Sequence, residues 1–94
     1  MDGPDETLRA AMSAEASGNR SEAISLLKGA LKRWPQHATF AVRLAESYRA
    51  TGNHKAAVKV LKKVIKNHPE RLDAVLTSAR SNLVLGKAKI AERQ

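Results

Sequence analysis

Several residue types are scarce in this chain of 94 residues, and each scarcity excludes a class of protein. Cysteine is absent, which excludes disulfides, thiolate nucleophiles and most structural zinc sites. No run of about 18 or more apolar residues occurs, so no segment is expected to span a membrane. The N-terminus, Met-Asp-Gly-Pro-Asp-Glu, is acidic and has no apolar core, unlike a signal peptide. We therefore expect a cytoplasmic protein or a segment of a larger parent, and a secreted or membrane-anchored parent stays open.

Aromatic and acidic residues are also few. Only 3% of the residues are aromatic, whereas 43% are hydrophobic, mostly Ala, Leu and Val, a mixture typical of closely packed helices. The net charge of +8 comes from 17 basic and 9 acidic residues. Between Ala23 and Pro69 the only acid is Glu46. The middle of the chain is therefore strongly basic.

What the chain does contain is an internal repeat. Gly18-Asn19 recurs as Gly52-Asn53 after 34 residues, and Gly86 follows Gly52 at the same distance. The same offset joins Ala23 to Ala57, Leu27 to Leu61, Leu31 to Ile65 and Pro35 to Pro69. Gly-Asn supplies the positive φ and the capping side chain of a tight turn between helices, and proline ends the second helix. The repeat therefore predicts stacked helical hairpins.

Apolar residues at 3.6-residue spacing give the expected helices. They run over about 4–17, 21–34, 38–50, 55–66 and 70–85, with turns at Gly18, Gly52 and Gly86. Residues 87–94 then form a short sixth helix that should fray.

The repeat resembles the tetratricopeptide repeat, which has a period of about 34 residues. In the second repeat the matching residues are Ala41, Leu44, Ala45, Tyr48, Ala57, Leu61 and Pro69. The resemblance implies an all-α, right-handed superhelix of five to six helices. It also implies a single domain over residues 1–94, with repeats at about 4–37 and 38–71 and a partial repeat at 72–94.

The same resemblance implies a protein–protein interaction module, a scaffold or adaptor that belongs to a larger assembly. In this family the first helix of each hairpin lines a concave groove, which here would bind an apolar or amphipathic segment of a partner. The matching groove positions are Leu8, Met12, Val42, Glu46, Arg49, Leu76, Arg80 and Leu83. The alternative is that the apolar ones pack on each other or on a second copy.

A subset of the family grasps the C-terminal carboxylate of chaperones with lysine, arginine and asparagine side chains. The positions that would carry this clamp hold Leu8, Met12, Arg43, Asp73 and Thr77. Only Arg43 is cationic, and Asp73 would repel a carboxylate. We do not expect a clamp of this type.

A basic face is the second candidate surface. Lysines recur at helical spacing on the second helix of each hairpin, at Lys28, Lys32, Lys55, Lys59, Lys62 and Lys66. This convex face would attract nucleic acid or an acidic partner, with affinity that falls as salt rises. It has no interleaved aromatic residues for base stacking, so nucleic acid is the less favoured partner. Solubility alone is a third explanation of the lysines.

The sequence gives almost no support for catalysis. His37, His54 and His68 all fall in turns between helices, and none stands at metal-ligand spacing from another histidine or a carboxylate. Neither a phosphate-binding glycine loop nor a nucleophile motif occurs. We therefore expect no enzyme, no metal and no cofactor.

The C-terminal edge of the array is expected to expose apolar side chains. Little chain follows to cover Val75, Leu83, Val84 and Leu85. A longer parent chain, or a second copy in a homo-oligomer, would shield this edge. Otherwise Ile90 and Ala91 cover it.

Overall fold

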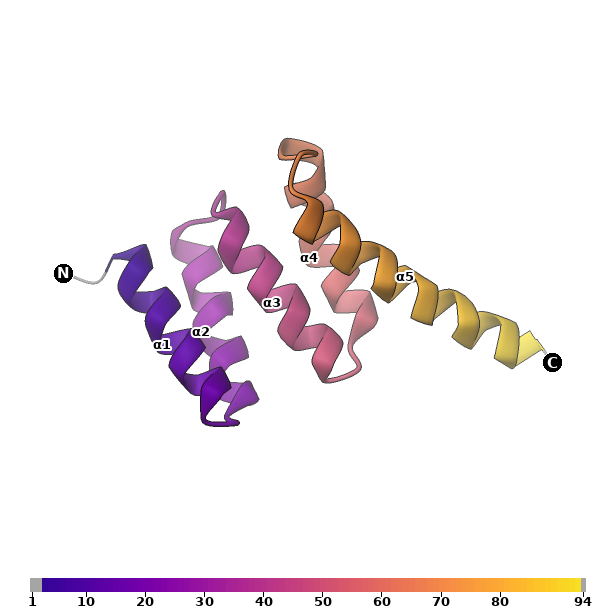
Figure 1. Cartoon of the computed structure of the whole chain (residues 1–94), viewed down its shortest axis with the longest axis horizontal. Helices are drawn as coiled ribbons and strands as arrows, with labels where there is room; N and C mark the ends of the chain where they lie inside the picture. The colour runs from indigo at the N-terminus through magenta and orange to yellow at the C-terminus, as the bar shows by residue number, and fades with distance from the viewer. Residues whose placement is uncertain (1–2, 94) are drawn as a thin grey trace.

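The computed structural model describes residues 3–93, which form five α-helices and no strand (Figure 1). The helices are α1 (Pro4–Ala16), α2 (Arg20–Arg33), α3 (Ala38–Ala50), α4 (His54–Asn67) and α5 (Leu72–Arg93). The principal extents are 54 × 30 × 19 Å, so the molecule is elongated. The all-α helical-hairpin prediction is confirmed.

The helices lie in two layers. In Figure 1, α1, α3 and α5 follow one another along one side, while α2 and α4 lie behind them. Consecutive helices pack against each other, and α3 also contacts α5 directly. Each helix of the second layer therefore lies between two helices of the first, which makes the array continuous.

Two glycines make the turns within the hairpins. Gly18 has φ +82° and Gly52 has φ +85°, a region that L-residues with a Cβ avoid. The next residue in each turn caps the following helix, because the side chains of Asn19 and Asn53 accept hydrogen bonds of 3.3 Å from the amides of Glu22 and Ala56. Both predicted Gly-Asn turns are therefore present, with the same geometry.

The ends of α2 and α4 also repeat. The Trp34 amide donates to the Ala30 carbonyl at 2.7 Å, and the His68 amide donates to the Val64 carbonyl at 2.7 Å. A proline follows each of these caps, which prevents the helix from continuing. The second helix of each repeat therefore ends at an equivalent residue and with the same hydrogen bond.

The core consists of two neighbouring clusters of buried side chains. One lies between α3, α4 and α5 and contains Ala41, Val42, Ala45, Ala57, Leu61, Val64 and Ala74. The other joins the first hairpin to α3 and contains Ala11, Leu27, Ala30, Phe40 and Leu44. Small alanines let the helices approach closely, and the larger leucines and Phe40 fill the remaining space. The 34-residue period therefore reflects repeated packing.

The predicted third turn at Gly86 is wrong. α5 continues without interruption to Arg93, so the helix does not end at Leu85 and no sixth helix forms in residues 87–93. Gly86 is followed by Lys87 instead of an asparagine, so no side-chain cap is available to start a new helix. A separate helix of two turns would also be too short to be stable. Continuing α5 costs only the low helix propensity of one glycine.

Candidate functional site

The layer formed by α1, α3 and α5 brings equivalent positions of the three repeats into rows. Met12, Glu46 and Arg80 are separated by 34 residues each and occupy the same turn of α1, α3 and α5. Glu15, Arg49 and Leu83 form a second row one turn further on. We call the surface that carries these two rows the concave layer, after the groove that the family resemblance predicts there. It contains most of the groove residues predicted from the sequence.

The apolar members of the concave layer are exposed at its two ends. Met12 is 43% exposed on α1, while Leu76 and Leu83 are 54% and 60% exposed on α5. Leu8 is only partly exposed, because it packs against the core cluster beneath α1. Covering exposed methionine and leucine side chains with a partner removes apolar surface from water and therefore stabilises the complex.

Val42 does not belong to the exposed surface. It is 5% exposed and lies in the core cluster together with Ala74 of α5. The sequence prediction that Val42 lines an open groove is therefore wrong. The physical reason is that α3 is the middle helix of its layer, and α5 covers this position.

A polar contact joins α1 to α3. Arg43 donates from Nη1 to Glu15 Oε2 at 3.4 Å, and the Ser47 hydroxyl donates to Glu15 Oε1 at 3.4 Å. Ser47 is buried, whereas Arg43 and Glu15 are about 30% exposed. Arg43, the single cation at the positions of the carboxylate clamp, is thus already paired with an acid. Thr77, another of those positions, is buried.

Two charged residues of the concave layer, Glu46 on α3 and Arg80 on α5, have no counter-ion among the side chains of residues 3–89. Both are exposed and form no ion pair there. The Nε atom of Arg49 is buried without a hydrogen-bond acceptor. A buried donor without an acceptor lowers the stability of the fold.

The predicted basic face lies on the opposite layer. Lys28 and Lys32 on α2 and the four lysines of the α4 stripe, Lys55, Lys59, Lys62 and Lys66, are all exposed. Lys28 places its Nζ 5.9 Å from the centre of the Tyr48 ring, and the others make no ion pair in the described chain. Trp34 and Tyr48 are both half-buried, and Trp34 stacks on Phe40 with ring centres 5.8 Å apart. The face therefore offers charge without stacking surfaces.

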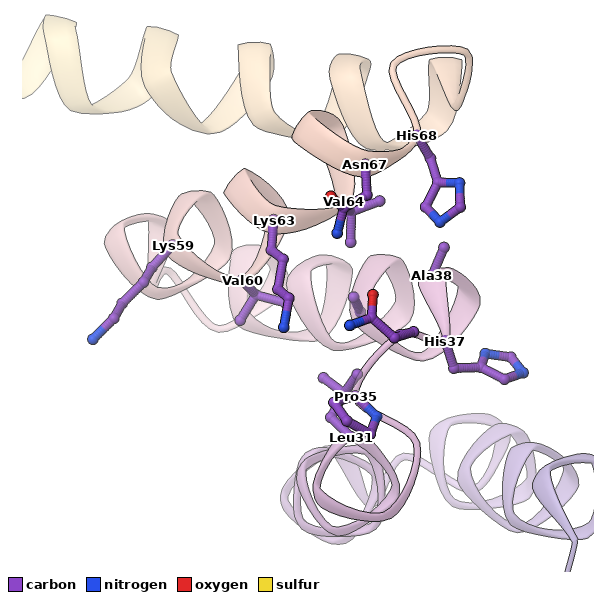
Figure 2. A pocket seen from close by; sticks show the side chains of 12 residues that line it. Leu31, Pro35, His37, Ala38, Lys59, Val60, Lys63, Val64, Asn67 and His68 are labelled. Atoms are coloured by element: carbon purple, nitrogen blue, oxygen red, sulfur yellow. The ribbon is translucent and has the colours of Figure 1, made fainter.

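A cavity of about 250 Å³ opens between the end of α2, the start of α3 and α4. Figure 2 shows Val60, Val64 and Lys63 on α4 pointing toward the side of the cavity formed by Leu31 and Pro35, whereas Lys59 extends away. The lining is mostly apolar, and its residues include part of the core surface between the two hairpins. The sequence prediction did not include this cavity, because it forms only where two repeats meet.

The three histidines lie in or beside turns, as expected from the sequence. His37 contacts Phe40 with ring centres 4.2 Å apart and ring planes tilted by 37°, and its Nδ1 atom is buried without a partner. His54 contacts Ser81, and His68 lies 3.4 Å from Glu70. Among the side chains of residues 3–89, no three histidines or carboxylates gather in a group that could hold a metal ion.

Arg71 and Asp73 form a bidentate salt bridge at the start of α5. Nε and Nη2 of Arg71 donate to the two carboxylate oxygens of Asp73 at 3.0 and 2.8 Å. These hydrogen bonds lower the pKa of Asp73 below its usual value and raise the pKa of Arg71. Asp73, predicted to exclude a carboxylate ligand, is therefore ionised at neutral pH.

Comparisons with known proteins agree with this geometry. The family model described as tetratricopeptide repeat matches residues 14–83, which is more than half of the chain. No curated protein sequence gives a significant match. Each helix in residues 3–93 is too short or too polar to cross a lipid bilayer. The match covers both Gly-Asn turns, the whole of α2, α3 and α4, the last turn of α1 and the first half of α5. This chain belongs to the tetratricopeptide repeat family.

Proposed function

We propose that this chain is a protein–protein interaction module whose concave layer binds an apolar or amphipathic segment of a partner protein. Repeats of this family generally serve as protein-binding modules. The observation that supports this surface most strongly is the exposure of Met12, Leu76 and Leu83 in one layer of helices. They lie on the two outer helices of the layer, and Glu46 on the middle helix α3 is exposed between them.

The charged residues would set the position of the bound segment. Glu46 and Arg80 stand beside the exposed apolar groups and have opposite charges. A segment with a basic residue near Glu46 and an acidic residue near Arg80 would therefore bind in one direction only.

The experiment selects short peptides from a random phage-displayed library against the chain and maps the selected peptides by ¹⁵N chemical-shift perturbation. The expected shifts cluster at Met12, Glu46 and Leu83, and Met12→Glu weakens binding by about tenfold or more. Lys66→Glu, on the opposite layer, is the matched control and leaves the affinity unchanged. Shifts confined to α2 and α4 would overturn the proposal.

The rival function is electrostatic binding of nucleic acid or an acidic partner by the convex lysines. It is supported by the exposure of all six lysines of that face. A titration with random-sequence nucleic acid at increasing salt tests it, because binding through phosphates weakens steeply with salt. Binding that is salt-independent, or undetectable at low salt, excludes this rival.

A further inference from the structure

α5 carries an apolar stripe on the side opposite to its core contacts. The core side of the helix presents Ala74, Thr77 and Ser81, which are buried. The opposite side presents Leu72, Leu76, Ala79, Leu83 and Gly86, and all five are exposed. Their spacing alternates between four and three residues. This is the spacing of the contact seam in a pair of coiled helices.

The repeat itself indicates what kind of structure fits on this stripe. Leu8, Val42 and Leu76 occupy the same place in α1, α3 and α5, 34 residues apart. Val42 is buried because the next helix of its layer, α5, covers it. Leu76 is exposed because no helix follows α5 in that layer within residues 3–93. The equivalent cover for Leu76 is therefore another helix.

The second half of α5 stands apart from the rest of the molecule. Figure 1 shows α5 continuing beyond the first turn of α4, which begins at His54. Between residues 82 and 89 every side chain is exposed except that of Leu85, which is half-buried. A helix that exposes leucine and has so little packing gains most of its stability from a partner helix.

We propose that this partner is α5 of a second copy of the chain, paired antiparallel about a two-fold axis level with Ser81. In this register, Leu76 lies opposite Gly86 of the second copy, and Ala79 lies opposite Leu83 of the second copy. A Cβ atom placed on Gly86 would have no atom within 4 Å. The surface at Gly86 is therefore open and has room for the Leu76 side chain of the second copy. A parallel pair would instead place glycine against glycine and leucine against leucine, which leaves a gap at one level and crowding at another.

Charge favours the same arrangement. Asp73, Arg80 and Lys87 lie along one edge of the stripe at seven-residue spacing. Antiparallel pairing brings Asp73 of each copy beside Lys87 of the other, whereas a parallel pair brings no opposite charges together. The Asp73 side chain is 47% exposed although it binds Arg71, and a carboxylate can accept hydrogen bonds from both. Arg80 meets Arg80 of the second copy at the axis, which weakens the dimer.

The pairing uses Leu76 and Leu83, which also belong to the concave layer. The inference is nevertheless tested on the chain alone, without any peptide, so it can fail while the proposed function stands. The contact between two helices is small compared with a standard interface of about 1,600 Å². We therefore expect a weak dimer that forms with increasing concentration.

The first test is sedimentation equilibrium at protein concentrations from micromolar to millimolar. The expected average mass rises from that of the 10.2 kDa monomer toward the dimer. Lys87→Asp and Asp73→Lys each weaken the dimer by about tenfold, and the double variant restores it, because the charge pair is then reversed. A monomer at every concentration overturns the inference. A dimer in which the double variant is as weak as the single ones overturns it equally.

A second test places a probe at the axis. Arg80→Gln removes the repulsion and is expected to tighten the dimer several-fold. Arg80→Cys should give a linked dimer with a short bis-maleimide, since the two thiols would lie near each other across the axis. Lys66→Cys on α4 is the control and should stay monomeric. Equal cross-linking of the two variants, or a dimer that Arg80→Gln weakens, overturns the antiparallel register.

Discussion

His54 at the start of α4 lies 3.4 Å from Ser81 in the middle of α5, measured between Nδ1 of the imidazole and Oγ of the serine. Ser81 is completely buried, and this contact is its side chain's link to another helix. It joins the start of α4 to the last fully buried side chain of α5 within residues 72–89. The second half of α5 leaves the molecule beyond this contact.

Replacing Ser81 by alanine should lower the free energy of unfolding by about 1 kcal/mol relative to Ser78→Ala, because only Ser81 has a partner on another helix. Both substitutions gain the same helix propensity, so their difference isolates the hydrogen bond. Urea unfolding followed by circular dichroism measures it. Equal effects of the two substitutions would show that the His54 contact does not contribute.

Alanine substitution at two glycines of the repeat should have opposite effects. Gly52 has φ +85°, so Gly52→Ala is expected to destabilise the fold by about 1–2 kcal/mol. Gly86 lies within α5 with open space around it, so Gly86→Ala should stabilise that helix by about 0.5–1 kcal/mol. Thermal unfolding at micromolar concentration compares the two. Destabilisation by Gly86→Ala would indicate a turn at that residue.

Stability should depend on pH through Asp73. Its pKa is lowered in the folded state, first by the hydrogen bonds from Arg71, so its contribution is present above the usual value of 3.8 and is lost as the pH falls through its folded pKa. The group is nearly half exposed, so the contribution stays below about 1 kcal/mol. Asp73→Asn should therefore be less stable than the wild type at neutral pH and equal to it in strong acid. A difference that persists in strong acid would contradict this.

A charge introduced at Val42 should have a very different effect from one at Leu83. Val42→Glu buries a carboxylate in the core and should unfold the protein or cost about 3 kcal/mol or more. Leu83→Glu lies on an exposed surface and should change the unfolding free energy by less than about 0.5 kcal/mol. Chemical denaturation of both variants distinguishes them. Similar costs would mean that Leu83 is covered in the monomer.

The charge-reversal variant that carries both Lys59→Glu and Lys62→Glu tests the convex face. If the rival function holds, this variant loses binding to random-sequence nucleic acid by about tenfold or more at low salt. It should leave peptide binding to the concave layer unchanged, because both lysines belong to α4 on the other layer. Fluorescence anisotropy measures both affinities. Reduced peptide affinity in the folded variant would place the peptide on the convex face.

The sequence predicted the fold most reliably at the two turns where the same Gly-Asn pair occurs. The two Gly-Asn turns follow from the backbone freedom of glycine and the capping side chain of asparagine, and both are present. The third turn was wrong because Gly86 repeats the glycine without the asparagine. The change to Lys87 was the available signal.

Residue exposure was harder to predict, because it depends on which helix comes next in space. Val42 and Leu76 share one place in the repeat, but α5 covers only the first of them. Similarly, the cavity beside Val60 forms where two hairpins meet and has no motif of its own. The choice of partner depends on such non-local contacts, which periodicity does not encode.

The projection of α5 has a consequence for the order in which the fold opens. Amide protons before Ser81 are held by a helix that packs on two neighbours, so their exchange with deuterium should follow unfolding of the second hairpin. Amides between residues 82 and 89 have only the helix itself to protect them and should exchange much earlier. A limited digest should accordingly cut first after Lys87 or Lys89 and leave a shorter fragment with both hairpins intact.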